Sequence, residues 1–409
     1  MKHFASFVLA LVAAASLVHA LTHRAPPPLP PEVLERVRGR LAQLAQAPHP
    51  LGSAAHQTAQ AQLAAWAAED GATVEQHRGT GTRQDGDLTV LFDAPVVLAR
   101  VEGTTPGAKA LVVDAHFDSA AESPGASDNG VAVVAALEAL RALARHPGVH
   151  PVVFAFDGSE EERLTGANAA LTHPWVATAG AHLNLDAVGR AGRPVVFRAS
   201  AAARPLLLAY ARTVPAAHAS VLGRDLVESG AVPSETDHRI YDELGHVPGL
   251  DVALYEDGAA YHTPLDGPAG VSDEVLTRVV GALVGFIPEA AALPSLTEDG
   301  AAPWVFFDVL GLGLLAPGPL LLLLVALAAA GVSLFALRRA RARIRPLGAA
   351  LLALVLSVLA AAVAGALVVF VLRGPHFWFA HPPLALAYGV AAAVAASWSS
   401  AWLGRDLDA

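Results

Sequence analysis

The stretch that decides the fold runs from Leu111 to Gly166: LVVDAHFDSAAESPGASDNGVAVVAALEALRALARHPGVHPVVFAFDGSEEERLTG. It contains two short apolar runs, Leu111–Val113 and Val152–Phe156, which are bounded by polar clusters as buried strands are. Between them, Val131–Leu143 has the apolar spacing of a helix. This order predicts a crossover unit in which an acidic loop follows each strand. Open α/β sheets bind ligands at this edge, beyond the carboxyl ends of their strands.

The alternation of strands and helices continues on both sides of this stretch. We expect further helices at 32–47, 54–68, 201–212 and 273–286, and further strands at 73–76, 88–101, 182–185, 194–198 and 252–255. The run 88–101 contains Asp93-Ala94-Pro95, which predicts a hairpin within it. The alternation indicates an α/β fold with a mostly parallel mixed sheet and helices on both faces.

Composition divides the 409 residues into parts of different character. Hydrophobic residues make up 54% of the chain and its mean hydropathy is +0.45, which is high for a purely soluble protein. Residues 1–21 hold an apolar run after Lys2, and this pattern predicts a secretory signal peptide or an uncleaved signal anchor. Residues 22–31 then form a proline-rich linker, and 32–300 are expected to be the α/β domain.

Residues 301–403 are expected to form a membrane region. Three apolar runs, at 320–337, 347–372 and 384–403, are about long enough to be transmembrane helices. The arginine-rich loop 338–345 separates the first two runs, whereas 287–319 contains no lysine or arginine. The positive-inside rule places this loop, and with it the tail 404–409, in the cytoplasm. The predicted location is therefore a multi-pass membrane protein whose α/β domain is extracytoplasmic, with membrane lipids as partners.

Two properties of the whole chain narrow its partners and chemistry. The net charge is −10, and no basic run occurs outside the loop 338–345, so nucleic acid is not an expected partner. The chain contains no cysteine, which excludes disulfides, thiolate metal ligands and a cysteine nucleophile.

Several metal-ligating side chains follow apolar, strand-like runs in order along the chain. They are His116, Asp128, Glu160, Glu161, Asp186 and His262. Each alone has an ordinary structural explanation: Asp128 precedes a helix as an N-cap would, and the glutamates suit a helix start. Together at one sheet edge, however, these carboxylates would repel one another unless cations were bound. Carboxylates and imidazoles are ligands of the kind that two zinc ions accept.

The ordered motifs resemble those of a known enzyme group. They are His-x-Asp at 116–118, Gly-Ala-x-Asp-Asn-Gly at 125–130, Gly-Ser-Glu-Glu at 158–161, Asn-Leu-Asp at 184–186 and Tyr-His-Thr at 261–263. This set is similar to that of the co-catalytic zinc aminopeptidases of the MH clan. The segments 48–53, 233–238 and 305–311 resemble its membrane-tethered branch, which includes the endoplasmic reticulum metallopeptidases and vacuolar membrane proteases. The resemblance covers about residues 31–313.

The resemblance implies a role for each of these residues. One zinc ion is assigned to His116 and Asp186 and a second to Glu161 and His262, with Asp128 bridging the two. Asp118 is expected to orient the His116 ring. Glu160 is expected to be the general base acting on a zinc-bridging water, and Tyr261 either donates to the oxyanion or is a packed aromatic residue. The implied reaction is removal of N-terminal residues from peptide substrates.

The sequence departs from the family pattern at two positions near the acidic pair. Asp157 stands where the family often has asparagine, and Arg163 stands where glycine is common, so the substrate range is open. Nearby, Asp237 is expected to cap the short helix that follows it.

Other functions are compatible with these motifs. A carboxypeptidase or dipeptidase of the same clan would need an arginine for the substrate carboxylate, which the sequence alone does not place. A related single-zinc fold catalyses glutaminyl cyclisation, but the complete ligand set favours two metals. A non-catalytic receptor or scaffold would typically have lost ligands or the base, and a transporter is disfavoured because the predicted spans lack charged residues.

Overall fold

The computed structural model describes residues 24–220, 235–300, 304–309 and 312–339, together with positions 13, 16, 17, 20 and 225. The chain divides into two compact units, and the α/β domain lies entirely in the unit Val18–Pro317. Helix α10 (Pro319–Arg339) belongs to the other unit. None of the helices among the described residues is long and apolar enough to cross a bilayer, and this includes α10, which covers the predicted span 320–337. The predicted spans 347–372 and 384–403, and most of the predicted signal segment 1–21, lie outside the described residues.

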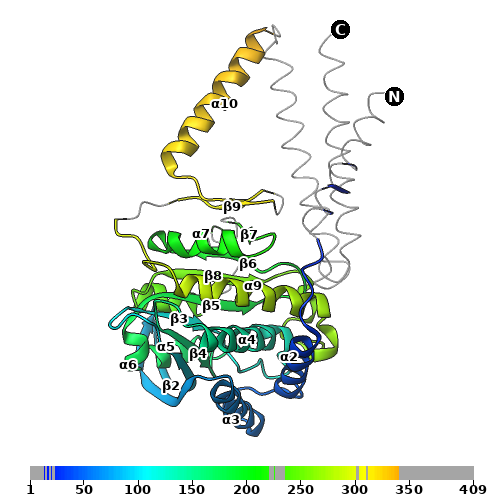
Figure 1. Cartoon of the computed structure of the whole chain (residues 1–409), viewed down its shortest axis with the longest axis vertical. Helices are drawn as coiled ribbons and strands as arrows, with labels where there is room; N and C mark the ends of the chain where they lie inside the picture. The colour runs from blue at the N-terminus through cyan, green and yellow to red at the C-terminus, as the bar shows by residue number, and fades with distance from the viewer. Residues whose placement is uncertain are drawn as a thin grey trace. The chain divides into compact units, whose positions relative to one another are not determined.

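An eight-stranded sheet forms the centre of the domain, in the order β1-β2-β4-β3-β5-β8-β6-β7 (Figure 1). The strands are β1 (Thr73–Asp85), β2 (Leu88–Val101), β3 (Ala110–Asp114), β4 (Val152–Asp157), β5 (Ala179–Ala187), β6 (Val195–Ala199), β7 (His218–Ala219) and β8 (Gly249–Leu254). The four central strands, β4, β3, β5 and β8, are parallel, and antiparallel pairing joins β2 and β6 to them. The predicted α/β fold with a mostly parallel sheet is therefore confirmed.

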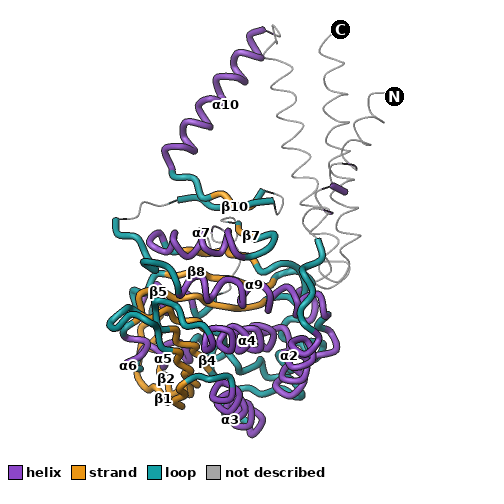
Figure 2. Tube along the Cα trace, viewed as in Figure 1, coloured by secondary structure: helices purple, strands orange, loops and turns teal. Residues whose placement is uncertain are grey.

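Helices cover both faces of this sheet (Figure 2). One face packs against α2 (Pro31–Leu44), α3 (Ala54–Glu69), α4 (Val131–Arg145), α7 (Arg204–Thr213) and α9 (Asp273–Ala291). The other face packs against α5 (Thr165–Leu171), α6 (Pro174–Ala177) and the single π-turn η3 (Ile240–Leu244). Alternate residues of one strand serve the two faces: Leu111 and Val113 join the first cluster, and Val112 joins the second. Both faces of β3 are buried, which explains its continuous apolar sequence.

The remaining elements are short. They are η1 (Ala126–Gly130), η2 (Ala201–Ala203), η4 (Gly258–Ala260), η5 (Pro268–Gly270) and a two-stranded sheet of β9 (Phe307–Asp308) and β10 (Leu314–Leu315). Of these, η1 and η4 matter for function, because each lies directly before or within a segment that carries a predicted ligand.

The predicted hairpin within 88–101 is wrong. β2 runs unbroken through Pro95, which pairs with Arg78 of β1, and the turn lies instead at Gly86, whose φ is +59°. Pairing of β2 with β4 begins only at Val96, so Pro95 interrupts no ladder on that side. β1 is longer than the predicted strand 73–76. Its outer half is mostly exposed and polar, and therefore lacks the apolar pattern of a buried strand.

Candidate metal centre

The five predicted ligands come together at the carboxyl ends of the parallel strands. His116 follows β3, Glu161 follows β4, Asp186 lies at the end of β5, and His262 follows β8 through η4. Asp128 comes from η1, before α4. Candidate ligand atoms of His116, Asp128 and Asp186 all lie within 4.8 Å of one another, as do those of Asp128, Glu161 and His262. The strand order thus gathers side chains that are up to about 150 positions apart in the chain.

Asp128 belongs to both groups because its two oxygens face different histidines. Its Oδ1 lies 3.3 Å from Nε2 of His116, and its Oδ2 lies 3.1 Å from Nε2 of His262. Asp186 Oδ1 is 3.7 Å from the same atom of His116, and Glu161 Oε2 is 3.1 Å from the same atom of His262. The result is two adjacent half-sites, each with one imidazole and one carboxylate of its own, that share a third carboxylate.

The atoms in these half-sites fit bound zinc. Nε2 of His116 and Oε1 of Glu161 are buried and have no hydrogen-bond partner among the described residues. Buried polar atoms are rarely left without a partner, so their state is explained if they ligate a cation. Imidazole nitrogen and carboxylate oxygen are also ordinary zinc ligands. His116, Asp128, Asp186, Glu161 and His262 would therefore hold the metal.

The charge balance of the centre leads to the same conclusion. Burial disfavours the charged form of His116, yet the carboxylates of Asp118, Asp128 and Asp186 raise its pKa well above the ordinary value. Burial likewise opposes charge on His262, but hydrogen bonding to Asp128 and Glu161 raises its pKa to about 10. Both rings are thus drawn toward the protonated form by surrounding negative charge, which is the environment that attracts a metal ion.

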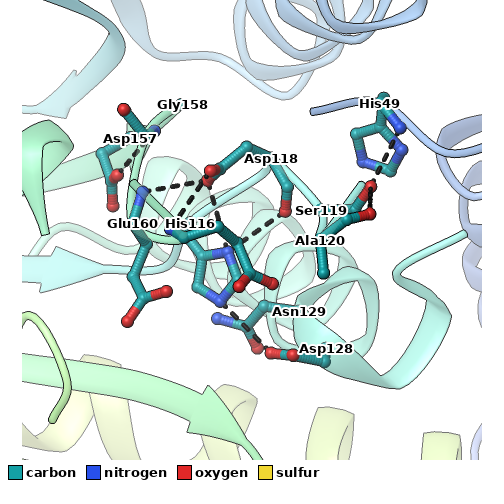
Figure 3. A network of polar contacts seen from close by, with 12 residues as sticks. His49, His116, Asp118, Ser119, Ala120, Asp128, Asn129, Asp157, Gly158 and Glu160 are labelled. Carbon is teal, nitrogen blue, oxygen red and sulfur yellow. Dashed lines mark hydrogen bonds and ion pairs between the residues drawn. The ribbon is translucent and has the colours of Figure 1, made fainter. Parts of the chain in front are cut away.

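Asp118 organises the inner side of the centre (Figure 3). Its carboxylate accepts hydrogen bonds from the backbone N–H groups of Glu160 and Glu161, at 3.1 and 3.2 Å. Nδ1 of His116 lies 3.2 Å from the backbone oxygen of Asp118 and 3.4 Å from its Oδ1. A proton on Nδ1 is therefore satisfied by Asp118, which leaves the lone pair of Nε2 facing Asp128.

Glu160 lies beside the ligands rather than among them. It occupies the turn between β4 and α5, and burial raises the pKa of its carboxyl well above the ordinary value. The glutamates were expected to open a helix, but α5 begins only at Thr165, after Arg163 and Leu164 adopt left-handed backbone angles. This turn separates the side chain of Glu160 from that of Glu161, which belongs to a half-site.

His262 has an uncommon backbone conformation, with φ at +55°. A left-handed non-glycine residue costs on the order of 1–3 kcal/mol and is typical of functional sites. The ring of Tyr261 stacks on that of His262 with centroids 3.7 Å apart. Burial raises the pKa of Tyr261, so its hydroxyl keeps a proton that it can donate. The stacking on His262 agrees with the role of Tyr261 as a packed aromatic residue. The retained proton agrees with its role as a hydrogen-bond donor to the oxyanion.

Two residues that support the centre escaped the sequence analysis. Asp266 is fully buried, and its carboxylate accepts hydrogen bonds from the backbone N–H and hydroxyl of Ser127 and from the N–H of Asp128. Asn129 donates from Nδ2 to the backbone oxygen of Leu185, at 2.6 Å. These bonds fix η1 and thereby aim Asp128. An acid four positions after His262 was the available signal for Asp266.

Two capping roles are not observed. Gly130, not Asp128, precedes α4, and no side chain caps that helix. The expected cap by Asp237 is also wrong, because Arg239 occupies that position before η3 and no side chain makes the capping bond. Asp237 is instead buried in the interior, with only 1% of its surface exposed.

The domain is similar in sequence to known proteins. Residues 96–287 match Peptidase family M28. Rat endoplasmic reticulum metallopeptidase 1 is 36% identical over 238 residues, which are 56% of this chain and 26% of the relative. The vacuolar membrane protease of Schizophyllum commune is 31% identical over 284 residues, which are 67% of this chain and 31% of the relative. The chain thus spans about a quarter to a third of these relatives.

Solved structures share the fold at low sequence identity. An aminopeptidase from Aneurinibacillus sp. strain AM-1 superposes with a TM-score of 0.52 at 14% identity, over 70% of this chain and 98% of its own. A glutaminyl cyclase from Bacteroides thetaiotaomicron gives 0.50 at 16% identity, over 64% and 99%. Over residues 96–287 this chain is therefore similar to Peptidase family M28.

Proposed function

We propose that the chain is a membrane-anchored, zinc-dependent exopeptidase that removes N-terminal residues from peptides. The observation that carries the proposal is the pair of half-sites sharing Asp128, with Glu160 directly beside them. A structural acid cluster would not need two imidazoles whose Nε2 atoms face one carboxylate. The fold alone would not decide the matter, because aminopeptidases and glutaminyl cyclases both have it.

The side chains divide the chemistry between them. When bound, two zinc ions supply a water of lowered pKa and polarise the scissile carbonyl. Glu160 accepts the proton of the attacking water and returns it to the leaving amine, a role suited to a carboxyl whose pKa burial has raised. Tyr261 donates its hydroxyl proton to the developing oxyanion. Asp118 holds the backbone of Glu160 in place throughout.

The carboxylate oxygens of the centre favour a substrate with a free α-amine. The side chains of Asp128, Glu160, Glu161 and Asp186 surround the two rings. Two bound zinc ions would balance most of their negative charge, and oxygens that do not contact a metal would accept hydrogen bonds from an ammonium group at this edge. A carboxypeptidase or dipeptidase would instead present an arginine to the substrate.

Substrate blocking tests this assignment. The full chain, purified in detergent and loaded with zinc, should hydrolyse leucine p-nitroanilide but not its N-acetylated form, and a chelator should abolish the reaction. Elemental analysis should find up to two zinc ions per chain. Preferential cleavage of N-acetylated peptides with a free carboxyl end would favour the carboxypeptidase. Cyclisation of N-terminal glutamine without peptide hydrolysis would favour a cyclase, and neither reaction despite bound zinc would favour a scaffold.

We place the protein in a membrane, with its peptidase domain on the extracytoplasmic side and lipids as neighbours. The support comes from the apolar runs 347–372 and 384–403, from the arginine-rich loop 338–345, and from the relatives, which are named endoplasmic reticulum metallopeptidase and vacuolar membrane protease.

A further inference from the structure

A second cluster of carboxylates lies in the interior, outside the candidate metal centre. Asp114 and Asp157 are the last residues of the parallel neighbours β3 and β4, and Asp237 precedes η3. One oxygen from each lies within 4.8 Å of the others. We call these three residues the inner acid cluster. In Figure 3, Asp157 and Asp128 lie on opposite sides of His116.

The inner acid cluster is completely enclosed. Asp114 and Asp157 are 0% exposed, and Asp237 is 1% exposed. Isolated carboxylates in such a position are strongly disfavoured, because burial removes their hydration and mutual repulsion adds to the cost. Burial, followed by the charges of Asp157 and Asp114, accordingly raises the pKa of Asp237 well above its ordinary value.

The protein satisfies only part of this cluster. The hydroxyl of Tyr241 donates to Oδ1 of Asp114 at 2.7 Å, and the backbone N–H of Ser159 donates to Oδ1 of Asp157 at 3.2 Å. The remaining oxygens, Oδ2 of Asp114, Oδ2 of Asp157 and Oδ1 of Asp237, are buried with no hydrogen-bond partner. Within the described residues, no arginine, lysine or histidine forms an ion pair with any of the three. Each of the three side chains thus has one oxygen without a partner outside the cluster, and within the cluster Asp237 lies in hydrogen-bonding reach of Asp114 and of Asp157.

We propose that the inner acid cluster holds one divalent cation of the hard, oxygen-preferring class, Mg²⁺, Mn²⁺ or Ca²⁺, in addition to the two zinc ions of the proposed function. The ligand set is oxygen only, without the imidazole or thiolate that favours zinc. A divalent cation supplies positive charge within the cluster itself, whereas the charge of His116 acts on Asp114 and Asp157 without forming an ion pair with either. It also joins the ends of β3 and β4 to the segment 235–244. The turn that carries Glu160 directly follows β4.

The competing explanation is that the three carboxyls share protons and bind no metal. The two explanations differ in metal content, so elemental analysis of the purified full chain separates them. Because the site has no solvent exposure, a cation incorporated during folding should survive gel filtration in detergent. Cells are grown with added Mn²⁺ and Ca²⁺, and zinc, magnesium, manganese and calcium are measured together with leucine p-nitroanilide hydrolysis.

The wild-type chain should carry one hard cation beyond its zinc. Asp157→Asn and Asp237→Asn, which remove one charge at almost constant volume, should each lose that cation and keep zinc. The exposed pair Arg78–Asp93 offers a matched control, Asp93→Asn, which should keep all metals. His262→Ala should lower zinc and leave the hard cation in place, so failure of the zinc proposal is recognised separately.

Two results overturn the inference. One is a wild-type chain whose content of magnesium, manganese and calcium does not exceed that of Asp157→Asn, as proton sharing requires. The other is a hard cation that persists in both cluster variants, which locates it elsewhere. Thermal melting of each variant confirms that it is folded, and two variants from separate segments guard against the failure of either one to fold.

Discussion

The carboxylate of Asp118 accepts a hydrogen bond from the backbone N–H of Glu160, at 3.1 Å. Its other oxygen accepts from the N–H of Glu161, and the same group lies 3.4 Å from Nδ1 of His116. The buried side chain of Asp118 therefore positions the proposed base Glu160 and one predicted ligand of each half-site, Glu161 and His116. This group joins the turn after β4 to the turn after β3, in addition to the backbone hydrogen bond from the N–H of Phe117 to the carbonyl oxygen of Asp157.

Replacing Asp118 should weaken both metal affinity and turnover. Asp118→Asn keeps one acceptor oxygen but presents an amide N–H₂ to one of the two backbone donors. It also removes the negative charge beside Nδ1 of His116, which keeps the backbone oxygen of residue 118 as an acceptor. Loss of such supporting groups typically costs about 10–100-fold in metal affinity or activity. Competition with a chromophoric chelator measures the affinity, and Asp93→Asn is the control. Unchanged zinc affinity in Asp118→Asn would contradict the positioning role.

Glu160→Gln should keep both zinc ions and lose catalysis. Glutamine preserves the size of the side chain and one hydrogen-bond acceptor but does not accept a proton, so turnover should fall by roughly two to four orders of magnitude. KM should change little, because the ligands are intact. Steady-state kinetics combined with metal analysis gives both quantities from one preparation.

Glu161→Gln should show the opposite pattern. The half-site of His262 loses a charged ligand, so zinc occupancy should drop toward one ion per chain and recover in part at high zinc concentration. If Glu160→Gln sheds metal while Glu161→Gln stays loaded and inactive, the two roles are reversed. If both variants keep full activity, the catalytic interpretation of this turn is wrong.

Asp266→Asn should destabilise the fold around Asp128. The substitution places an N–H₂ group against at least one of the backbone donors of Ser127 and Asp128, and a buried donor without an acceptor costs about 1–3 kcal/mol. Urea unfolding of zinc-free protein isolates this cost from metal binding. Zinc affinity should fall in parallel, because Asp128 loses its orientation. A variant with wild-type stability and weaker zinc binding would limit Asp266 to orienting the ligand.

Reporter fusions should reveal the sidedness of the chain. A reporter active only outside the cytoplasm should work when fused after Gly300 and fail when fused at Arg343, a position beyond the described residues. The reason is the contrast between the arginine-rich loop 338–345 and the segment 287–319, which contains no lysine or arginine. The reverse pattern would overturn both the topology and the export of the domain.

Sequence patterns were sufficient to predict the central fold and the residues that gather at its edge. β3, α4 and β4 carry strong apolar periodicity, and the acids directly after the strands must share one edge because the strands are parallel. The prediction that His116 and Glu161 lie at the same edge of the sheet therefore follows from the sequence alone. Their roles in metal binding and catalysis stay predictions until the variants are measured.

The misses have a common physical cause, which is that local sequence does not reveal a distant partner. Asp266 and Asp128 are 138 positions apart, and nothing near either residue indicates their hydrogen bond. Asp237 was predicted to be a cap because it precedes a short helical segment, whereas its side chain is buried beside Asp114 and Asp157, which end strands far away in the sequence. The turn at Gly86 was missed because the exposed, polar half of β1 lacks the pattern of a strand.

The two histidines of the centre differ greatly in contact with water: the side chain of His116 is 2% exposed, and that of His262 is 38% exposed. Exchange with the medium should consequently be asymmetric. The ring of His262 is in contact with solvent, whereas in the half-site of His116 the most exposed side chain is that of Asp186, at only 10%. Dilution or a mild chelator would empty the outer half-site first and leave a long-lived, singly loaded species. When zinc is scarce, the rate at which the protein loses its first zinc ion is then set by the half-site of His262.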